Sequence, residues 1–180
     1  MTMKKILTKL FICAYLKMQG GSSMKEKIKQ LLAYLIQNHP PLPITSLMKL
    51  SYIVDLVSIK KYNKQISNFE YIRYKYGPFN NKIYEYMQNL LENNIISEEP
   101  DYTPRGDEYI IYKFNQESDV SFDKLTEDDK EVIDEVLNSL RGYGAKALVD
   151  LAYKTKPMKK IGATQDNDVG LKEKLDLRAE

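Results

Sequence analysis

Apolar residues recur at helical spacing in several segments of the chain, which puts them on one face of an α-helix. This pattern predicts helices over residues 25–38, 45–62, 80–93 and 126–140, with a short final helix over residues 145–153. The second of these has a broad apolar face, so we expect it to lie at the centre of the core. The chain is therefore predicted to be mainly helical.

The helix that begins at Thr126 has the clearest start signal in the sequence. The Thr126 hydroxyl can accept from the amide of Asp129 while the Asp129 carboxylate reaches back, which is the reciprocal arrangement of a capping box. Gly142 and Gly144 mark the expected end of this helix, because glycine accepts the left-handed backbone found at many helix ends. The proline-rich residues 39–43 should end the first helix and connect it to the second.

Two regions have the composition of extended chain. Residues 69–76 are rich in aromatic side chains and predict a short strand or extended segment that ends at Gly77-Pro78. Residues 95–97 and 109–114 flank a polar loop with two prolines and a glycine, which predicts a hairpin with a long tip. The predicted fold class is α+β, a compact helical domain with a small antiparallel hairpin and winged-helix-like features.

The two ends of the chain differ in character from its middle. Residues 1–23 are interpreted as an N-terminal extension upstream of Met24, because their apolar run is short and no A-x-A pattern follows it. An appended short helix is the alternative. The domain itself is predicted over residues 24–160, and the charged residues 161–180 are expected to form a tail that orders on a partner.

Charge is distributed unevenly along the sequence. The formal net charge is +2, yet residues 98–135 contain fourteen carboxylates and four basic groups, whereas residues 1–86 are basic. This asymmetry can steer a charged partner, or it can let the two halves of one fold attract each other. The single cysteine excludes an intramolecular disulfide and favours the cytoplasm, and no segment is apolar enough to span a membrane.

No catalytic or metal-binding set is recognisable. His39 and Cys13 are the only residues of their kinds, too few for a zinc site, and phosphate-binding loops and nucleophile elbows are missing. Acidic pairs such as Asp128 and Glu131 are expected to be the solvated face of a helix. We therefore expect no enzyme activity, no metal and no cofactor.

The segment 60–86 interleaves six tyrosines with six basic residues. Aromatic rings stack on bases and basic groups neutralise phosphates, although tyrosines packed with only their hydroxyls at the surface explain the pattern more simply. Together with the hairpin, this segment leaves a winged helix-turn-helix DNA-binding regulator as the alternative function. The candidate recognition helix carries Lys82 but also Glu85 and Glu92, which does not favour contact with phosphates.

Three short sequence patterns follow one another along the chain. A K-L-x-Y-x-x-D pattern spans Lys49–Asp55, a Y-G-P pattern spans Tyr76–Pro78, and a helix then leads into the predicted hairpin. In this order they resemble the Panacea antitoxin domain, a family that includes the SocA-like antitoxins, over roughly residues 25–160. Members often carry a histidine and a tryptophan near the C-terminus, where this chain has Tyr153 and Met158.

The resemblance implies an antitoxin that neutralises a cognate protein toxin, encoded nearby, by direct contact, or that presents the toxin to a protease. DNA is a less favoured partner and no membrane is implied. The acidic region 98–135 is a candidate surface against a basic toxin. For Asp55 the alternative is structural, as a carboxylate that caps backbone groups or bonds a tyrosine. The candidate partner-binding residues are Tyr52, Asp55, Tyr74, Tyr76, Gly77, Pro78 and Tyr153.

Overall fold

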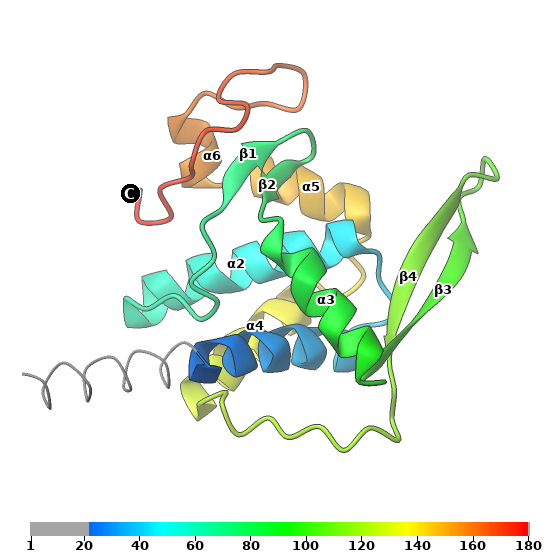
Figure 1. Cartoon of the computed structure of the whole chain (residues 1–180). Helices are drawn as coiled ribbons and strands as arrows, with labels where there is room; N and C mark the ends of the chain where they lie inside the picture. The colour runs from blue at the N-terminus through cyan, green and yellow to red at the C-terminus, as the bar shows by residue number, and fades with distance from the viewer. Residues whose placement is uncertain (1–21, 180) are drawn as a thin grey trace, which may run out of the picture.

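Helix α2 (Ile44–Tyr62) runs through the middle of the computed structural model, which describes residues 22–179 (Figure 1). A first helix covers residues 22–37, and α4 (Glu127–Ser139) and α5 (Ala145–Tyr153) also pack around α2. Because neighbours surround α2, most of its residues are buried, including polar ones. The predicted central helix is confirmed.

Strands β1 (Ile72–Tyr74) and β2 (Gly77–Phe79) form a tight antiparallel hairpin against α2 and α5. The prediction that Gly77-Pro78 ends the extended segment is wrong, because both residues belong to the second strand. Gly77 has a φ of +94°, which lets the chain reverse directly into β2. Pro78 lacks an N–H, and it is tolerated because β2 has an open edge in a two-stranded sheet.

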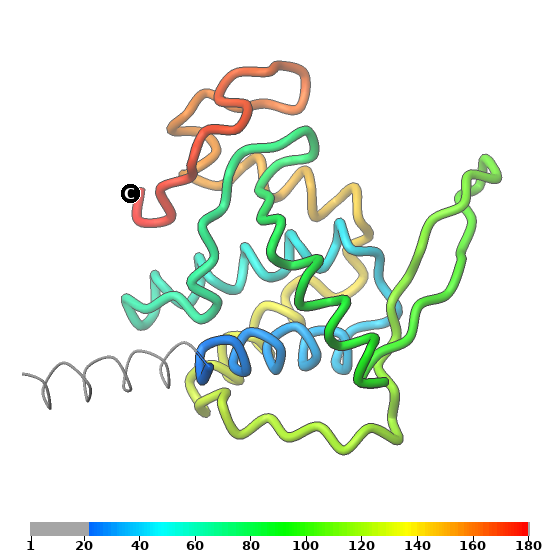
Figure 2. Tube along the Cα trace, viewed as in Figure 1, coloured from blue at the N-terminus to red at the C-terminus, as the bar shows by residue number. Residues whose placement is uncertain are grey.

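A second antiparallel hairpin projects from the body as an arm (Figures 1 and 2). It follows α3 (Lys82–Glu92) and consists of β3 (Ile96–Tyr102) and β4 (Glu108–Phe114). The hairpin is confirmed, but the prediction of a long tip is wrong, since only residues 103–107 connect the strands. Residues 97–100 of β3 are exposed on both faces of the hairpin, so most of this strand lacks the alternating pattern that reveals a strand in sequence.

The capping box of α4 is confirmed. The amide of Asp129 donates to Thr126 Oγ1 at 3.2 Å, and the Asp129 carboxylate accepts from the Thr126 amide at 2.9 Å. Helix α5 has the bounds predicted for the final short helix, and one further helix, α6 (Lys156–Lys160), follows it. The fold class is confirmed as mainly helical α+β.

Residues 161–179 lie on the body of the protein. This differs from the predicted tail that orders on a partner. The Arg73 amide donates to the carbonyl of Glu173 at 2.8 Å, and the Leu175 amide donates to the carbonyl of Tyr71 at 2.8 Å. Leu175 is buried, and Figure 2 shows this segment alongside β1. The predicted N-terminal extension and Cys13 fall outside the described residues, apart from residues 22 and 23, which are helical.

Candidate partner-binding surface

Asp55 lies at the centre of a buried hydrogen-bond network. Its carboxylate accepts from the amides of Ile66 at 3.0 Å and Ser67 at 2.9 Å, from the Tyr71 hydroxyl at 2.9 Å, and from the Ser67 hydroxyl. Burial raises the pKa of the Asp55 carboxyl, and these hydrogen bonds oppose that rise. Asp55 is fully buried, so it holds the segment before β1 against α2.

Tyr52 and Tyr153 also lie inside the fold. The Tyr52 hydroxyl is hydrogen-bonded to Thr155 Oγ1 at 2.8 Å, which joins α2 to the chain after α5. Tyr153 packs under the β1–β2 hairpin, where its ring centroid is 6.0 Å from the guanidinium carbon of Arg73. Tyr153 and Met158 are both buried, so both side chains belong to the core.

Lys49 is the unexpected member of this region. Its side chain is only 3% exposed, and its ammonium donates to the carbonyl of Pro78 at 2.8 Å. No carboxylate of the described residues lies within 4.0 Å of it, and burial lowers the pKa of Lys49 to about 8. A Cβ at Gly77 would stand 3.5 Å from Lys49 Cε and from Tyr153, an ordinary van der Waals distance, so it is the φ of +94° that requires glycine beside this lysine.

Lys49 is not among the candidates chosen from the sequence, although it is the first residue of the K-L-x-Y-x-x-D pattern. Its position within the apolar run of a central helix is the feature that points to a buried lysine. A charged residue at such a position is rarely buried without a partner.

Exposed aromatic residues surround the turn above Lys49. Tyr74, Tyr76 and Tyr84 are 43%, 59% and 49% exposed. The ring of Phe79 lies 5.0 Å from that of Tyr74 and 6.2 Å from that of Tyr84. Between them and α2 is a pocket of about 240 Å³, whose lining includes Ile44, Met48, Lys49, Tyr74, Phe79 and Tyr84. We call it the Lys49 pocket.

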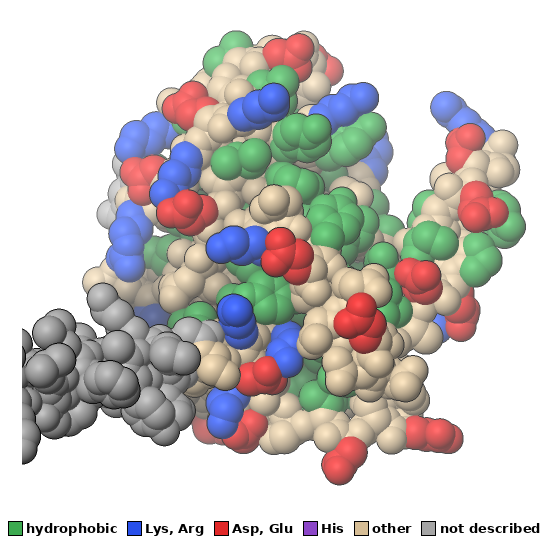
Figure 3. Space-filling view, viewed as in Figure 1, with side chains coloured by type: hydrophobic (Ala, Val, Ile, Leu, Met, Phe, Trp, Pro, Cys, Tyr) green, Lys and Arg blue, Asp and Glu red, His purple; other side chains and the backbone are tan. Residues whose placement is uncertain are grey.

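The arm adds a second set of apolar side chains. Strand register places Pro100, Tyr102 and Ile110 on the same hairpin face as Tyr112. Burial raises the pKa of Tyr112, and the neighbouring Glu98 and Tyr84 raise it further, so Tyr112 lies near Tyr84 of the body. Figure 3 shows hydrophobic side chains on both sides of the open space between arm and body. We call this space, together with the Lys49 pocket to which Tyr84 belongs, the tyrosine groove.

The acidic segment divides between two roles. In α4, Glu131 and Glu135 pair with Lys61 of α2 at 2.7 and 2.8 Å, and Asp129 pairs with Lys27 at 2.6 Å. These pairs show that the two oppositely charged halves of the chain attract each other within the fold. The arm keeps an acidic character of its own, with five carboxylates and two basic groups between residues 96 and 114.

The candidate residues therefore fall into two groups. Gly77, Pro78, Tyr153 and Tyr52 form the buried support of the β1–β2 hairpin, while Tyr74 and Tyr76 project from it into solvent. Asp55 lies apart from the groove, behind Tyr71. Only Tyr74 and Tyr76 present side chains that a partner can touch directly.

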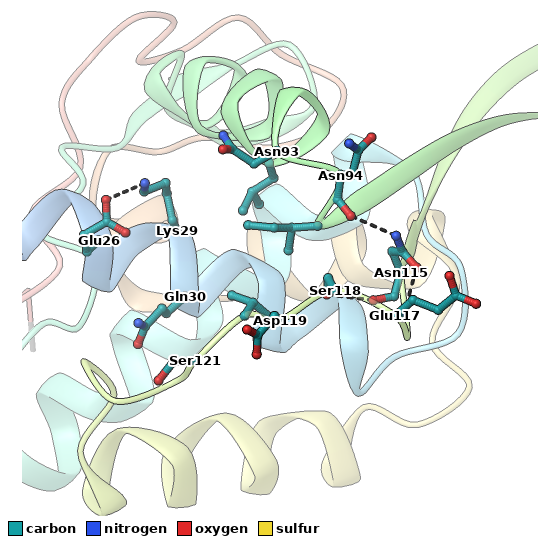
Figure 4. A pocket seen from close by; sticks show the side chains of 13 residues that line it. Glu26, Lys29, Gln30, Asn93, Asn94, Asn115, Glu117, Ser118, Asp119 and Ser121 are labelled. Atoms are coloured by element: carbon teal, nitrogen blue, oxygen red, sulfur yellow. Dashed lines mark hydrogen bonds and ion pairs between the residues drawn. The ribbon is translucent and has the colours of Figure 1, made fainter.

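Another cavity lies between the first helix and the end of α3, with a volume of about 590 Å³ (Figure 4). It is lined mainly by amides, carboxylates and serines, several of which bond one another, as Asn115 Nδ2 does to the carbonyl of Asn94 at 3.0 Å. Over residues 22–179, no three His, Cys, Asp or Glu side chains gather as a metal site would require, and no helix there is long and apolar enough to cross a membrane.

Comparison with protein families gives a match over most of the described chain. The family described as "Antitoxin SocA-like, Panacea domain" matches residues 47–157. No curated protein and no solved structure matches the chain significantly. The matched range begins in α2 and ends in α6, so it contains Lys49, both hairpins and the tyrosines of the groove, whereas Ile44 of the Lys49 pocket precedes it.

Proposed function

Because the chain belongs to the SocA-like antitoxin family with a Panacea domain, we propose that it neutralises a cognate protein toxin by direct contact. The family match over residues 47–157 is the observation that carries this proposal. Neutralisation by occlusion requires no covalent chemistry, only an interface of ordinary size, about 800 Å² on each partner. The proposed complex acts in the cytoplasm.

The tyrosine groove is the surface that best suits such a partner. Tyrosine is enriched among the residues that dominate interface energies, because its ring buries much apolar area and its hydroxyl keeps a hydrogen-bonding end. Tyr74, Tyr76 and Tyr84 on the body and Tyr102 on the arm are all exposed. Bound toxin would cover apolar surface that the isolated chain leaves in water.

The acidic arm suggests the charge of that partner. Its carboxylates include Glu98 and Glu108, which share the hairpin face of Tyr102 and Ile110. Charges at the rim of an interface mainly raise the association rate and select against partners of like charge. A toxin with a basic surface fits this arm.

The same complex can serve a second step, in which the antitoxin presents its toxin to a protease. A shorter toxin half-life in cells that contain the antitoxin would support this part of the proposal. An unchanged half-life, with toxicity still suppressed, would limit the function to occlusion.

The winged-helix DNA-binding alternative is less favoured. Arg73 is buried, Lys61 is paired with two glutamates, and the arm that would touch phosphates is acidic. A protein that neutralises several phosphates loses affinity steeply as salt increases. Salt-sensitive binding to DNA by the isolated chain would restore this alternative.

The decisive experiment co-expresses the chain with the product of each adjacent gene. We expect one product to be toxic alone, harmless in the presence of the chain, and recovered with it in equal amounts after nuclease treatment. If no neighbouring product is both toxic and suppressed, the antitoxin proposal fails.

A further inference from the structure

We propose that the Lys49 pocket receives the side-chain carboxylate of an Asp or Glu residue from the bound toxin, which pairs with the ammonium of Lys49. This inference rests on the proposed function and names the chemistry by which the toxin is recognised. It assigns to Lys49 the central contact of the tyrosine groove.

The ammonium of Lys49 is incompletely solvated in the folded chain. An ammonium has three N–H donors, and here one of them bonds to the carbonyl of Pro78. Among the described residues no carboxylate lies within the 4.0 Å of an ion pair, although the side chain is only 3% exposed. Buried charges are normally paired, so a nearly buried cation at the base of an open pocket is complementary to an anion.

The pocket around Lys49 has a largely apolar lining. Its walls are the aromatic rings of Tyr74, Phe79 and Tyr84 and the apolar side chains of Ile44 and Met48. In such surroundings an ion pair is less screened by water and salt than at an open surface. The volume of about 240 Å³ suits a side chain and not a larger molecule.

Lys49 is held in place before any partner arrives. The carbonyl of Pro78 accepts from its ammonium, and Gly77 lies beside its Cε. The hairpin that carries Gly77 and Pro78 is itself packed on α2 and α5. A pre-positioned cation loses little conformational freedom on binding, which leaves more of the interaction for affinity.

The acidic arm adds a condition on the toxin segment. Glu98 and Glu108 stand on the hairpin face that carries Tyr102 and Ile110, so they repel a segment that is acidic throughout. The matching segment has one carboxylate for Lys49, apolar neighbours for the tyrosines, and basic residues for the arm. This pattern distinguishes the proposed ligand from a simple acidic peptide.

The test selects a display library of random peptides on the full chain, with peptides displayed so that their C-termini are blocked. Enriched peptides are then synthesised with an amidated C-terminus and measured by fluorescence anisotropy. The chain variants are Lys49→Met, which removes the charge at similar length, and Lys75→Met as the matched control. Lys75 is an exposed lysine of the same hairpin, 5.7 Å from the ring of Tyr76.

We expect enriched peptides to contain an Asp or Glu beside apolar residues. Replacing that residue by Asn or Gln should weaken binding about tenfold or more, and Lys49→Met should do the same while Lys75→Met does not. The peptide substitution leaves the chain intact, so the test holds even if Lys49→Met alters folding. No enrichment, enrichment of neutral peptides, or binding only through a free C-terminus would overturn the proposal.

Failure of this inference is distinguishable from failure of the proposed function. If Lys49→Met suppresses the toxin as well as the unaltered chain, the antitoxin function stands and the carboxylate contact is wrong. If the unaltered chain suppresses no neighbouring toxin, the peptide measurements still report whether the pocket binds carboxylates.

Discussion

The buried ammonium of Lys49 should make the stability of the free protein rise with pH. Burial lowers the pKa of Lys49 from 10.5 to about 8 in the folded chain, while in the unfolded chain it returns to the ordinary value. Below pH 8 both states carry the proton, and the folded state bears the cost of a poorly solvated charge. Between the two pKa values the unfolded state binds a proton that the folded state has released, so stability increases as pH rises.

The size of this effect follows from the two pKa values. A difference between 10.5 and about 8 corresponds to roughly 3 kcal/mol, of which about 2 kcal/mol should be gained between neutral pH and pH 9.5. Lys49→Met should remove this dependence, because methionine carries no proton to release. The control Lys75→Met should keep it, since that lysine is exposed.

The assay is urea unfolding followed by circular dichroism at several pH values for the three proteins. Other titrating groups, including the tyrosines, are common to all of them, so the difference between variants isolates Lys49. A dependence of equal slope in Lys49→Met and the unaltered chain would refute the reasoning. It would mean that the ammonium of Lys49 is solvated in the folded protein.

Three further predictions follow from the fold and the groove. Asp55→Ala should cost about 3 kcal/mol or more in urea unfolding, because it leaves two buried amides and the Tyr71 hydroxyl without their acceptor; a loss below 1 kcal/mol would contradict the network. Thr126→Ala should cost about 1 kcal/mol by the same measurement, through loss of the capping box, and an unchanged midpoint would show that the cap is dispensable. Tyr76→Ala combined with Tyr84→Ala should weaken toxin binding about tenfold or more by calorimetry with little change in stability, since both rings are exposed; full affinity would remove the groove from the interface.

Local signals in the sequence predicted much of the fold. Each helix is specified by features that act within a few residues, namely its apolar stripe and, for α4, the capping box at Thr126 and the glycines that follow. The helices could therefore be predicted from the sequence alone. The arm was predicted for the same reason, from two apolar runs around a polar loop. Its full length was not, because exposed strand residues carry no burial pattern.

The remaining features depend on contacts between distant segments. The pairing of residues 172–175 with β1 uses backbone groups, which every residue possesses, so no side-chain pattern announces it. The environment of Lys49 arises only when α2, the β1–β2 hairpin and α5 meet. The candidates Tyr74 and Tyr76 were chosen from a motif, and the motif does not say that they project outward while Asp55 points inward.

The C-terminal segment also covers the edge of the small sheet formed by β1 and β2. The outward-facing N–H and C=O of Arg73 are both taken by residues 172–173, and the carbonyl of Tyr71 is taken by Leu175. An uncovered edge strand is a template on which a foreign strand can add, which is a common route to aggregation. Residues 172–175 thus occupy the edge of β1 with backbone hydrogen bonds from the same chain. A version shortened to residue 160 would leave that edge free to pair with a second copy.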